Sequence, residues 1–193
     1  MKKIFLLSMV CITLISAQAQ VGFKGGLNLS NWHGKSVPND AYTYLPGFYL
    51  GAYGNVALNK SISVQTDLVF SEEGVKQKSV DIHVRLNYLK LSELVRYNVK
   101  NSRFFIGTGP ELGFLMCAFQ KIGGTKSFLK DEIKVANISW AFAAGYDLKF
   151  GLGFYAGYSF GLSNILTELG ENAKQNNLQI GLRYNLKSKA RPK

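Results

Sequence analysis

Residues 103–116 read RFFIGTGPELGFLM, and large apolar side chains alternate there with small or polar ones. One face of this stretch carries Phe104, Ile106, Thr108, Pro110, Leu112 and Phe114. The other face carries Phe105, Gly107, Gly109, Glu111 and Gly113. Because successive side chains of a β-strand point to opposite faces, this period of two predicts a strand.

Seven further segments follow the same rule, which predicts eight strands in all. They lie at about 21–30, 48–58, 61–71, 86–99, 137–150, 154–163 and 178–187. The segment at 86–99 fits least well, because the face that carries Leu91 and Val95 also carries Glu93. We expect Glu93 either to lie near an interface or to be moved by a β-bulge that shifts the register.

The ends of the chain predict export. Residues 1–19 have the parts of a secretory signal peptide: Lys2 and Lys3, an apolar run over 4–15, and the small-x-small site Ala17-Gln18-Ala19. The apolar run has 12 residues, whereas a spanning helix needs about 20. We therefore predict a signal peptide at 1–19, followed by a barrel at 20–187 and a basic tail at 188–193. Because the protein is expected to be exported, we expect no nucleic-acid partner.

Composition narrows the class of protein further. With 13% aromatic residues, 20 glycines and 18% charged residues, the chain is neither disordered nor a disulfide scaffold. Cys117 is the only cysteine after the signal peptide, so no intramolecular disulfide is expected. The formal charge of +11, or +9 without Lys2 and Lys3, suits anionic lipid headgroups and lipopolysaccharide phosphate.

The alternation alone does not say which face points inward. In a water-soluble barrel the apolar face would fill the interior, but the polar face here is rich in glycine, serine and alanine, which suits a narrow barrel lumen. Short connections at 59–60, 100–102 and 151 alternate with four connections of about ten to twenty residues. We therefore predict an all-β, eight-stranded antiparallel transmembrane up-and-down β-barrel in the bacterial outer membrane, with both termini periplasmic.

The last strand contains a candidate assembly signal. Residues 179–186 read QIGLRYNL, a polar-x-Gly-x-x-aromatic-x-apolar run made by Gln179, Gly181, Tyr184 and Leu186. The run resembles the β-signal that the barrel-assembly machinery recognises, which would make that machinery a partner during biogenesis. It departs from the usual pattern because the chain does not end on an aromatic residue.

Four stretches carry a wider resemblance: FKGGLNLSN at 23–31, LNYL at 86–89, GTGPELG at 107–113 and YSFGLSNI at 158–165. Together they resemble the PorT-like outer-membrane β-barrel proteins of Bacteroidetes over essentially the whole mature chain. The resemblance implies an eight-stranded outer-membrane barrel and, for the founding branch, an accessory role in protein secretion. It implies no catalytic residue.

The inward face of the predicted barrel carries seven charged residues, and charges in a narrow interior must pair. They are Lys24, Asp67, Lys90, Arg96, Glu111, Asp147 and Arg183. Since eight strands enclose a space that side chains can fill, we expect a structural salt-bridge network that plugs the lumen. The alternative is a narrow pore for small solutes.

Residues suited to catalysis or metal binding are sparse. His33 and His83 are the only histidines, and we place both in long external loops. A lipid-modifying outer-membrane enzyme stays open as an alternative, but no spacing assembles a histidine with a serine and a carboxylate. We expect no enzymatic activity, no cofactor and no metal site.

Two basic regions predict partners. The third external loop, at about 118–134, carries four lysines that suit lipopolysaccharide phosphate. A second set of cations is predicted on the periplasmic side: Lys60, Lys100, Arg103, Lys149 and the tail. They either dock an acidic secretion-complex protein or anchor the barrel to lipid headgroups. We expect a monomer.

Overall fold

The protein was analysed as a computed structural model. The structure describes residues 20–35, 37, 42–78, 82–100, 102–122, 125–129, 133–167 and 172–186. The predicted signal peptide at 1–19 and basic tail at 188–193 lie outside these residues. Within the described ranges, no helix has the length and apolar character needed to cross a membrane.

The described residues form ten strands. Eight of them are long: β1 (Gln20–His33), β3 (Leu45–Ala57), β4 (Ile62–Gln77), β5 (Ile82–Asn98), β6 (Phe104–Ile122), β8 (Ala136–Asp147), β9 (Leu152–Gly161) and β10 (Lys174–Asn185). Two are short: β2 (Tyr42–Thr43), which pairs with β4, and β7 (Thr125–Phe128), which pairs with β6.

The eight long strands close into a barrel. Each pairs antiparallel with the next long strand along the chain. The barrel is closed by β1 and β10, which pair from Gly22 opposite Asn185 to His33 opposite Lys174. Closure leaves no free strand edge in the wall formed by the eight long strands, which is the condition for a sheet to cross a bilayer. The predicted eight-stranded antiparallel barrel is confirmed.

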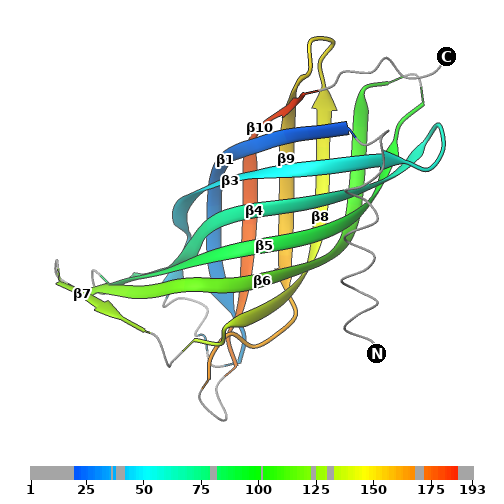
Figure 1. The fold of residues 1–193 in the computed structure, drawn as a ribbon. Helices are drawn as coiled ribbons and strands as arrows, with labels where there is room; N and C mark the ends of the chain where they lie inside the picture. Colours follow the sequence, from blue (N-terminus) through cyan, green and yellow to red (C-terminus); the bar gives the residue numbers. More distant parts are fainter. Residues whose placement is uncertain are drawn as a thin grey trace.

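The two ends of the barrel differ. Connections 58–61, 99–103 and 148–151 lie at one end, which we call the short-turn end. The first and last strands also meet there, since the backbone N–H of Leu186 donates to the carbonyl of Val21. The turn at 148–151 needs Gly151, whose φ is +94°, a conformation that L side chains rarely adopt. The opposite end, which we call the long-connection end, carries the other four connections (Figure 1).

One of those four connections was predicted wrongly. We expected a long loop between about 72 and 85, but β4 continues to Gln77 and β5 begins at Ile82. The alternation persists through this stretch, with Glu73 and Val75 buried and Glu72 paired outward with Arg85. As a result, β4, β5 and β6 extend past the other strands toward β7 (Figure 1).

The two histidines were also placed wrongly. His83 belongs to the extended part of β5, and His33 is the last residue of β1, so neither lies in a loop. Both lie near the long-connection end, because each occupies the end of its strand that is remote from the short turns. Charged and polar residues on these strand extensions resemble loop composition in the sequence.

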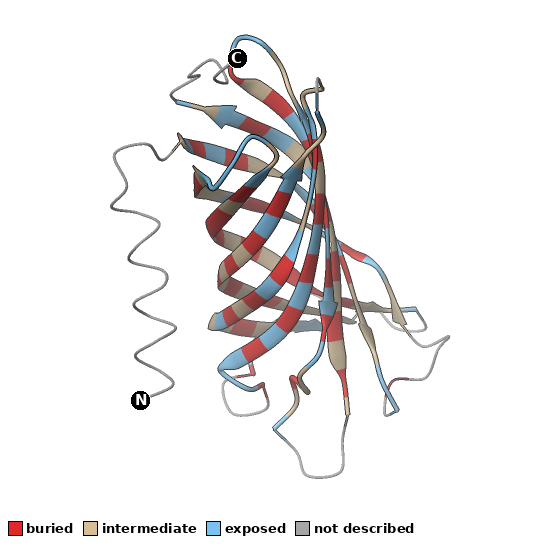
Figure 2. Cartoon of the chain, turned by 90° about the vertical axis from the view of Figure 1, so that its right-hand side faces the viewer, coloured by how far each residue is buried: buried red, intermediate tan, exposed pale blue. Residues whose placement is uncertain are grey.

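Most of the large apolar side chains of the long strands point outward. Leu27 is 69% exposed and Phe142 is 52% exposed, whereas the inward Lys24 is 4% exposed and Asp67 is not exposed at all. Figure 2 shows the alternation as buried and exposed bands along the strands. This is the reverse of a water-soluble barrel, and it gives the apolar face the position that contacts lipid in an outer-membrane barrel.

Glu93 faces outward, and no bulge moves it. The register of β5 against β6 shifts between Asn87 and Tyr88, toward the long-connection end from Glu93. The carboxylate accepts hydrogen bonds from Thr66 Oγ1 at 2.9 and 3.0 Å, across the β4–β5 pair. Of our two expectations for Glu93, the register shift is therefore wrong.

Candidate functional site: a paired polar interior

Inward glycines make room for aromatic rings inside the barrel. A Cβ added to Gly145 would lie 2.5 Å from the Phe105 ring, and one added to Gly181 would lie 2.5 Å from the Tyr49 hydroxyl. These contacts are too close to be tolerated, so small residues on the inner wall are a packing requirement. The rings belong to a buried cluster in the middle of the barrel: Tyr49, Val69, Leu94, Phe105, Ala141, Ala143 and Tyr155.

Three groups of charges surround this cluster. Nearest the short-turn end, Arg96 and Arg183 share the carboxylate of Asp147, at 2.7 and 3.3 Å. Both guanidinium groups also lie against the Phe105 ring, 3.6 and 4.7 Å from its centroid. Gln65 Oε1 accepts a hydrogen bond from each arginine, at 3.2 and 3.3 Å. Two cations on one carboxylate are therefore stabilised by an amide and an aromatic face.

The second group is a single ion pair. Lys24 Nζ lies 2.5 Å from Asp67 Oδ2 and 3.3 Å from the Tyr155 hydroxyl. Gln65 donates from Nε2 to the other carboxylate oxygen of Asp67 at 2.8 Å. Lys24 and Asp67 are both buried, so each neutralises a charge that would otherwise be unpaired in the interior.

The third group centres on Lys90, which lies between two carboxylates. Its Nζ is 2.6 Å from Glu73 and 2.9 Å from Glu111. Neutral side chains donate to the remaining oxygens of these carboxylates, with Ser92 on Glu111 and Gln175 on Glu73 at 2.9 and 2.6 Å. Both carboxylates are therefore satisfied without a solvent partner.

Glu73 is the interior residue that sequence reasoning missed. The alternation predicts a strand that ends at Ser71 and a loop after it. Continuing the alternation by one step would have found it, because Glu73 shares a face with Asp67 and Ser71. With Glu73 included, the described interior holds four cations and four carboxylates: Lys24, Lys90, Arg96, Arg183, Asp67, Glu73, Glu111 and Asp147.

An apolar cluster lies above these charges at the long-connection end, and we call it the apolar cap. Its buried members are Val37, Leu86, Tyr88, Ala118, Leu129, Ile133, Ile165 and Ala173. Backbone bonds tie its segments together: Leu129 N–H donates to Ala118 at 3.1 Å, and Ile165 N–H donates to Ala173 at 2.9 Å. Residues from three connections therefore pack over the inward side chains of β5 and β6.

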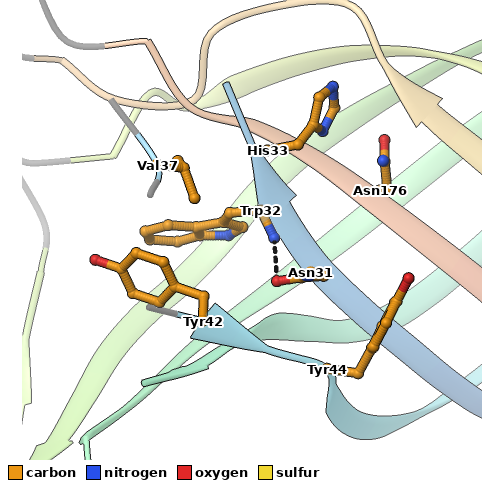
Figure 3. Close-up of a pocket in the computed structure, with 7 residues that line it drawn as sticks. All are labelled: Asn31, Trp32, His33, Val37, Tyr42, Tyr44 and Asn176. Carbon is orange, nitrogen blue, oxygen red and sulfur yellow. Dashed lines mark hydrogen bonds between the residues drawn. The ribbon is translucent and has the colours of Figure 1, made fainter. Parts of the chain in front are cut away.

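A cavity of about 220 Å³ lies beside the apolar cap (Figure 3). It is lined by Asn31, Trp32, His33, Val37, Tyr42, Tyr44 and Asn176. These residues come from the end of β1, from the connection that contains β2, and from β10. Neither this cavity nor the interior assembles a metal site, since the described residues hold no group of three His, Cys, Asp or Glu side chains placed to bind an ion.

Comparison with known proteins agrees with this geometry. The family model described as "Outer membrane protein beta-barrel domain" matches residues 16–167. The chain belongs to this family. It is thus a bacterial outer-membrane β-barrel protein, and the paired interior and apolar cap are features of an outer-membrane barrel.

Solved outer-membrane barrels have a similar fold. Ail, the attachment invasion locus protein of Yersinia pestis, crystallised with the heparin analogue sucrose octasulfate, matches with a TM-score of 0.50 and 16% identity, over 88% of this chain and 99% of Ail. Neisserial surface protein A matches with a TM-score of 0.53 and 15% identity, over 87% of this chain and 99% of that protein. No curated protein sequence is significantly similar to the chain.

The candidate assembly signal of this outer-membrane barrel lies on its closing strand. Gln179 is buried in the interior, and Gly181 lies against Gly26 of β1. Tyr184 and Leu186 point outward and are 47% and 53% exposed. The polar and glycine positions of the run therefore face the lumen, while its aromatic and apolar positions lie on the lipid-facing side near the short-turn end.

Proposed function

We propose that this outer-membrane barrel is a non-enzymatic monomer with a closed lumen, and that it acts through its two ends as a structural or interaction protein. The observation that carries the proposal is the pairing of four buried cations with three buried carboxylates and the half-buried Asp147 around a core of aromatic rings. A solute path would need some of these groups to face water, whereas side chains fill an eight-stranded barrel when they pair across it.

Orientation is part of the proposal. Outer-membrane barrels carry short turns on the periplasmic side and longer loops outside. We therefore assign the short-turn end, where both ends of the described chain lie, to the periplasm. The outward aromatic residues near that end support the assignment, because aromatic side chains favour the membrane interface. They are Tyr97, Phe104, Phe150, Phe154 and Tyr184.

Conductance tests the closed lumen. Purified protein in planar bilayers is expected to give no current steps. A matched variant, Tyr49→Ala with Phe105→Ala and Tyr155→Ala, removes the three aromatic rings of the buried cluster in the middle of the barrel. It is expected to conduct, provided that its gel mobility still shifts on heating. Current steps from the wild-type protein would instead support the narrow pore.

A secretion-accessory role is the sharper form of the proposal. Its support is the resemblance to PorT-like proteins together with the cations at the short-turn end, where Lys60, Lys100 and Lys149 are exposed. Deletion of the gene is expected to reduce export of secreted proteins, and reversing these three charges to glutamate is expected to reproduce the defect. Normal secretion in the deletion strain would contradict this role, and a changed lipid A profile would favour a lipid-modifying enzyme.

Outer-membrane lipids are the expected surroundings, and lipopolysaccharide phosphate is the proposed contact of the basic residues at the long-connection end. Lys121, Lys126 and Lys134 are the described lysines of the 118–134 region, and Lys126 lies 5.4 Å from the centroid of the Phe119 ring. Replacing all three with glutamine is expected to weaken binding of lipopolysaccharide to the purified barrel. Unchanged binding would exclude this region as the contact.

A further inference from the structure

The cavity beside the apolar cap has a wall of aromatic rings. The rings of Trp32 and Tyr42 lie 6.2 Å apart at an interplanar angle of 45°. Figure 3 shows Tyr44 across the cavity from this pair, with Asn31 between them. Aromatic surfaces of this kind cover the apolar face of a ligand while their polar atoms remain available at the edge.

Amides and hydroxyls supply the polar part of the lining. Asn31 Oδ1 accepts a hydrogen bond from the backbone N–H of Trp32 at 2.8 Å, which leaves its Nδ2 as a donor. Asn176 Oδ1 accepts from the Gly161 backbone at 3.2 Å. The Tyr42 hydroxyl is a second polar group of the lining that can both donate and accept. The lining therefore offers uncharged donors and acceptors next to aromatic faces.

Charge excludes several classes of ligand. The seven lining residues include no lysine, arginine, aspartate or glutamate. Among the described lining residues, a phosphate or sulfate group would find no lysine or arginine to pair with, and a metal ion would find no carboxylate ligand. A purely apolar ligand would cover the amide of Asn31 without giving it a hydrogen bond, which is unfavourable.

We propose that this cavity binds one ring of a neutral sugar. The C–H face of a sugar ring packs on aromatic side chains, and its hydroxyls both donate and accept, so they match the amides and the tyrosine hydroxyls. The cavity lies at the rim of the barrel at the long-connection end, since His33 is the last residue of β1. The His33 ring is also 5.2 Å from the ring of Phe160, which points outward. Two sources fit this position: a sugar of an outer-leaflet glycolipid and a soluble oligosaccharide.

The sugar site depends on the proposed orientation in one respect: a ligand outside the cell reaches it only if the long-connection end faces outward. Binding by the purified barrel does not depend on orientation or on a closed lumen. Failure of the binding test therefore leaves the proposed function standing, and failure of the conductance test leaves the sugar site standing.

The chain supplies its own reporter of binding. It has two tryptophans, Trp32 in the cavity wall and Trp140 on the outward face. The variant Trp140→Phe leaves Trp32 as the only indole, so its emission reports on the cavity. The full-length barrel in detergent is titrated with methyl glycosides of glucose, galactose and N-acetylglucosamine, then with lipid-free core oligosaccharide, and then with intact lipopolysaccharide.

A saturable change in Trp32 emission is expected with at least one of these probes. In the same background, Asn31→Ala and Tyr42→Phe are each expected to weaken binding about fivefold or more, because each removes one hydrogen bond to the sugar. Val135→Ala, at the same end but outside the lining, is the matched control and is expected to bind as before. Heat-modifiable gel mobility verifies that each variant is folded.

The outcomes separate the two sources. Equal affinity for core oligosaccharide and intact lipopolysaccharide supports a soluble ligand, whereas binding of lipopolysaccharide alone, weakened by Asn31→Ala, supports a glycolipid sugar. Absence of a saturable change with every probe overturns the proposal. Binding that Asn31→Ala and Tyr42→Phe leave unchanged also overturns it.

Discussion

Replacing Lys90 by methionine is expected to destabilise the barrel strongly. Lys90 Nζ lies 2.6 Å from Glu73 and 2.9 Å from Glu111, and all three side chains are at most 7% exposed. Methionine keeps the volume but removes the cation, which leaves two buried carboxylates without a counter-charge. Breaking a buried ion pair in this way costs about 3–5 kcal/mol, whereas replacing all the partners by neutral groups costs far less.

The magnitude is measured by urea unfolding in detergent micelles, followed by tryptophan fluorescence. We expect Lys90→Met to lose about 3–5 kcal/mol, and the triple variant that adds Glu73→Gln and Glu111→Gln to recover most of the loss. Lys60→Met, on an exposed turn, is the control and should unfold like the wild type. A single variant that loses less than about 1 kcal/mol would refute the buried ionic network, since that is the range of solvent-exposed pairs.

Three further predictions concern other parts of the barrel. Glu93→Leu is expected to stabilise the protein by about 1–2 kcal/mol in the same unfolding assay, because Glu93 faces lipid. It lies four residues from the interfacial Tyr97, or about 10 Å along the barrel axis. A loss of stability would contradict the lipid-facing position. Gly145→Ala is expected to lower the free energy of unfolding by about 1–3 kcal/mol, since its Cβ would lie 2.5 Å from the Phe105 ring. Gly107→Ala is the control and should be tolerated, because the nearest atom to its Cβ is 3.5 Å away. Equal effects of the two variants would show that the interior repacks freely. Tyr184→Ala is expected to lower the amount of assembled barrel in cells but not refolding in detergent, while Leu182→Ala, equally exposed on the same face, changes neither; equal assembly of both variants would remove Tyr184 from the assembly signal.

The architecture was predictable because the two faces of each strand meet different surroundings, lipid outside and side chains inside, and therefore leave a period of two in the sequence. Alternation in stretches such as 103–116 and 137–150 predicted strands whose apolar side faces outward, and the exposure of Phe114 and Phe142 agrees. Alternation between short and long connections predicted antiparallel neighbours. Alternation and connection length are local signals that can be read for each strand separately.

The predictions that failed concern how far the strands extend beyond the membrane. Beyond the apolar belt, the outer face can carry charges, so Glu72 and Arg85 resembled a loop although they pair across β4 and β5. As a consequence, Glu73 was not predicted to be an interior residue. The cavity beside the apolar cap was unpredictable for another reason, because Trp32, Tyr42 and Asn176 meet only when β1, β2 and β10 are placed in space.

Quenching of Trp140 by brominated lipid tests most directly the claim that large apolar side chains face the bilayer. Trp140 is 40% exposed on the outward face of β8, where its Nε1 donates to Thr108 Oγ1 at 2.8 Å. In the Trp32→Phe variant reconstituted into vesicles, Trp140 is the only indole. The account predicts strong quenching by bromines on the acyl chains and little quenching by aqueous iodide. Quenching by iodide without quenching by brominated lipid would contradict it.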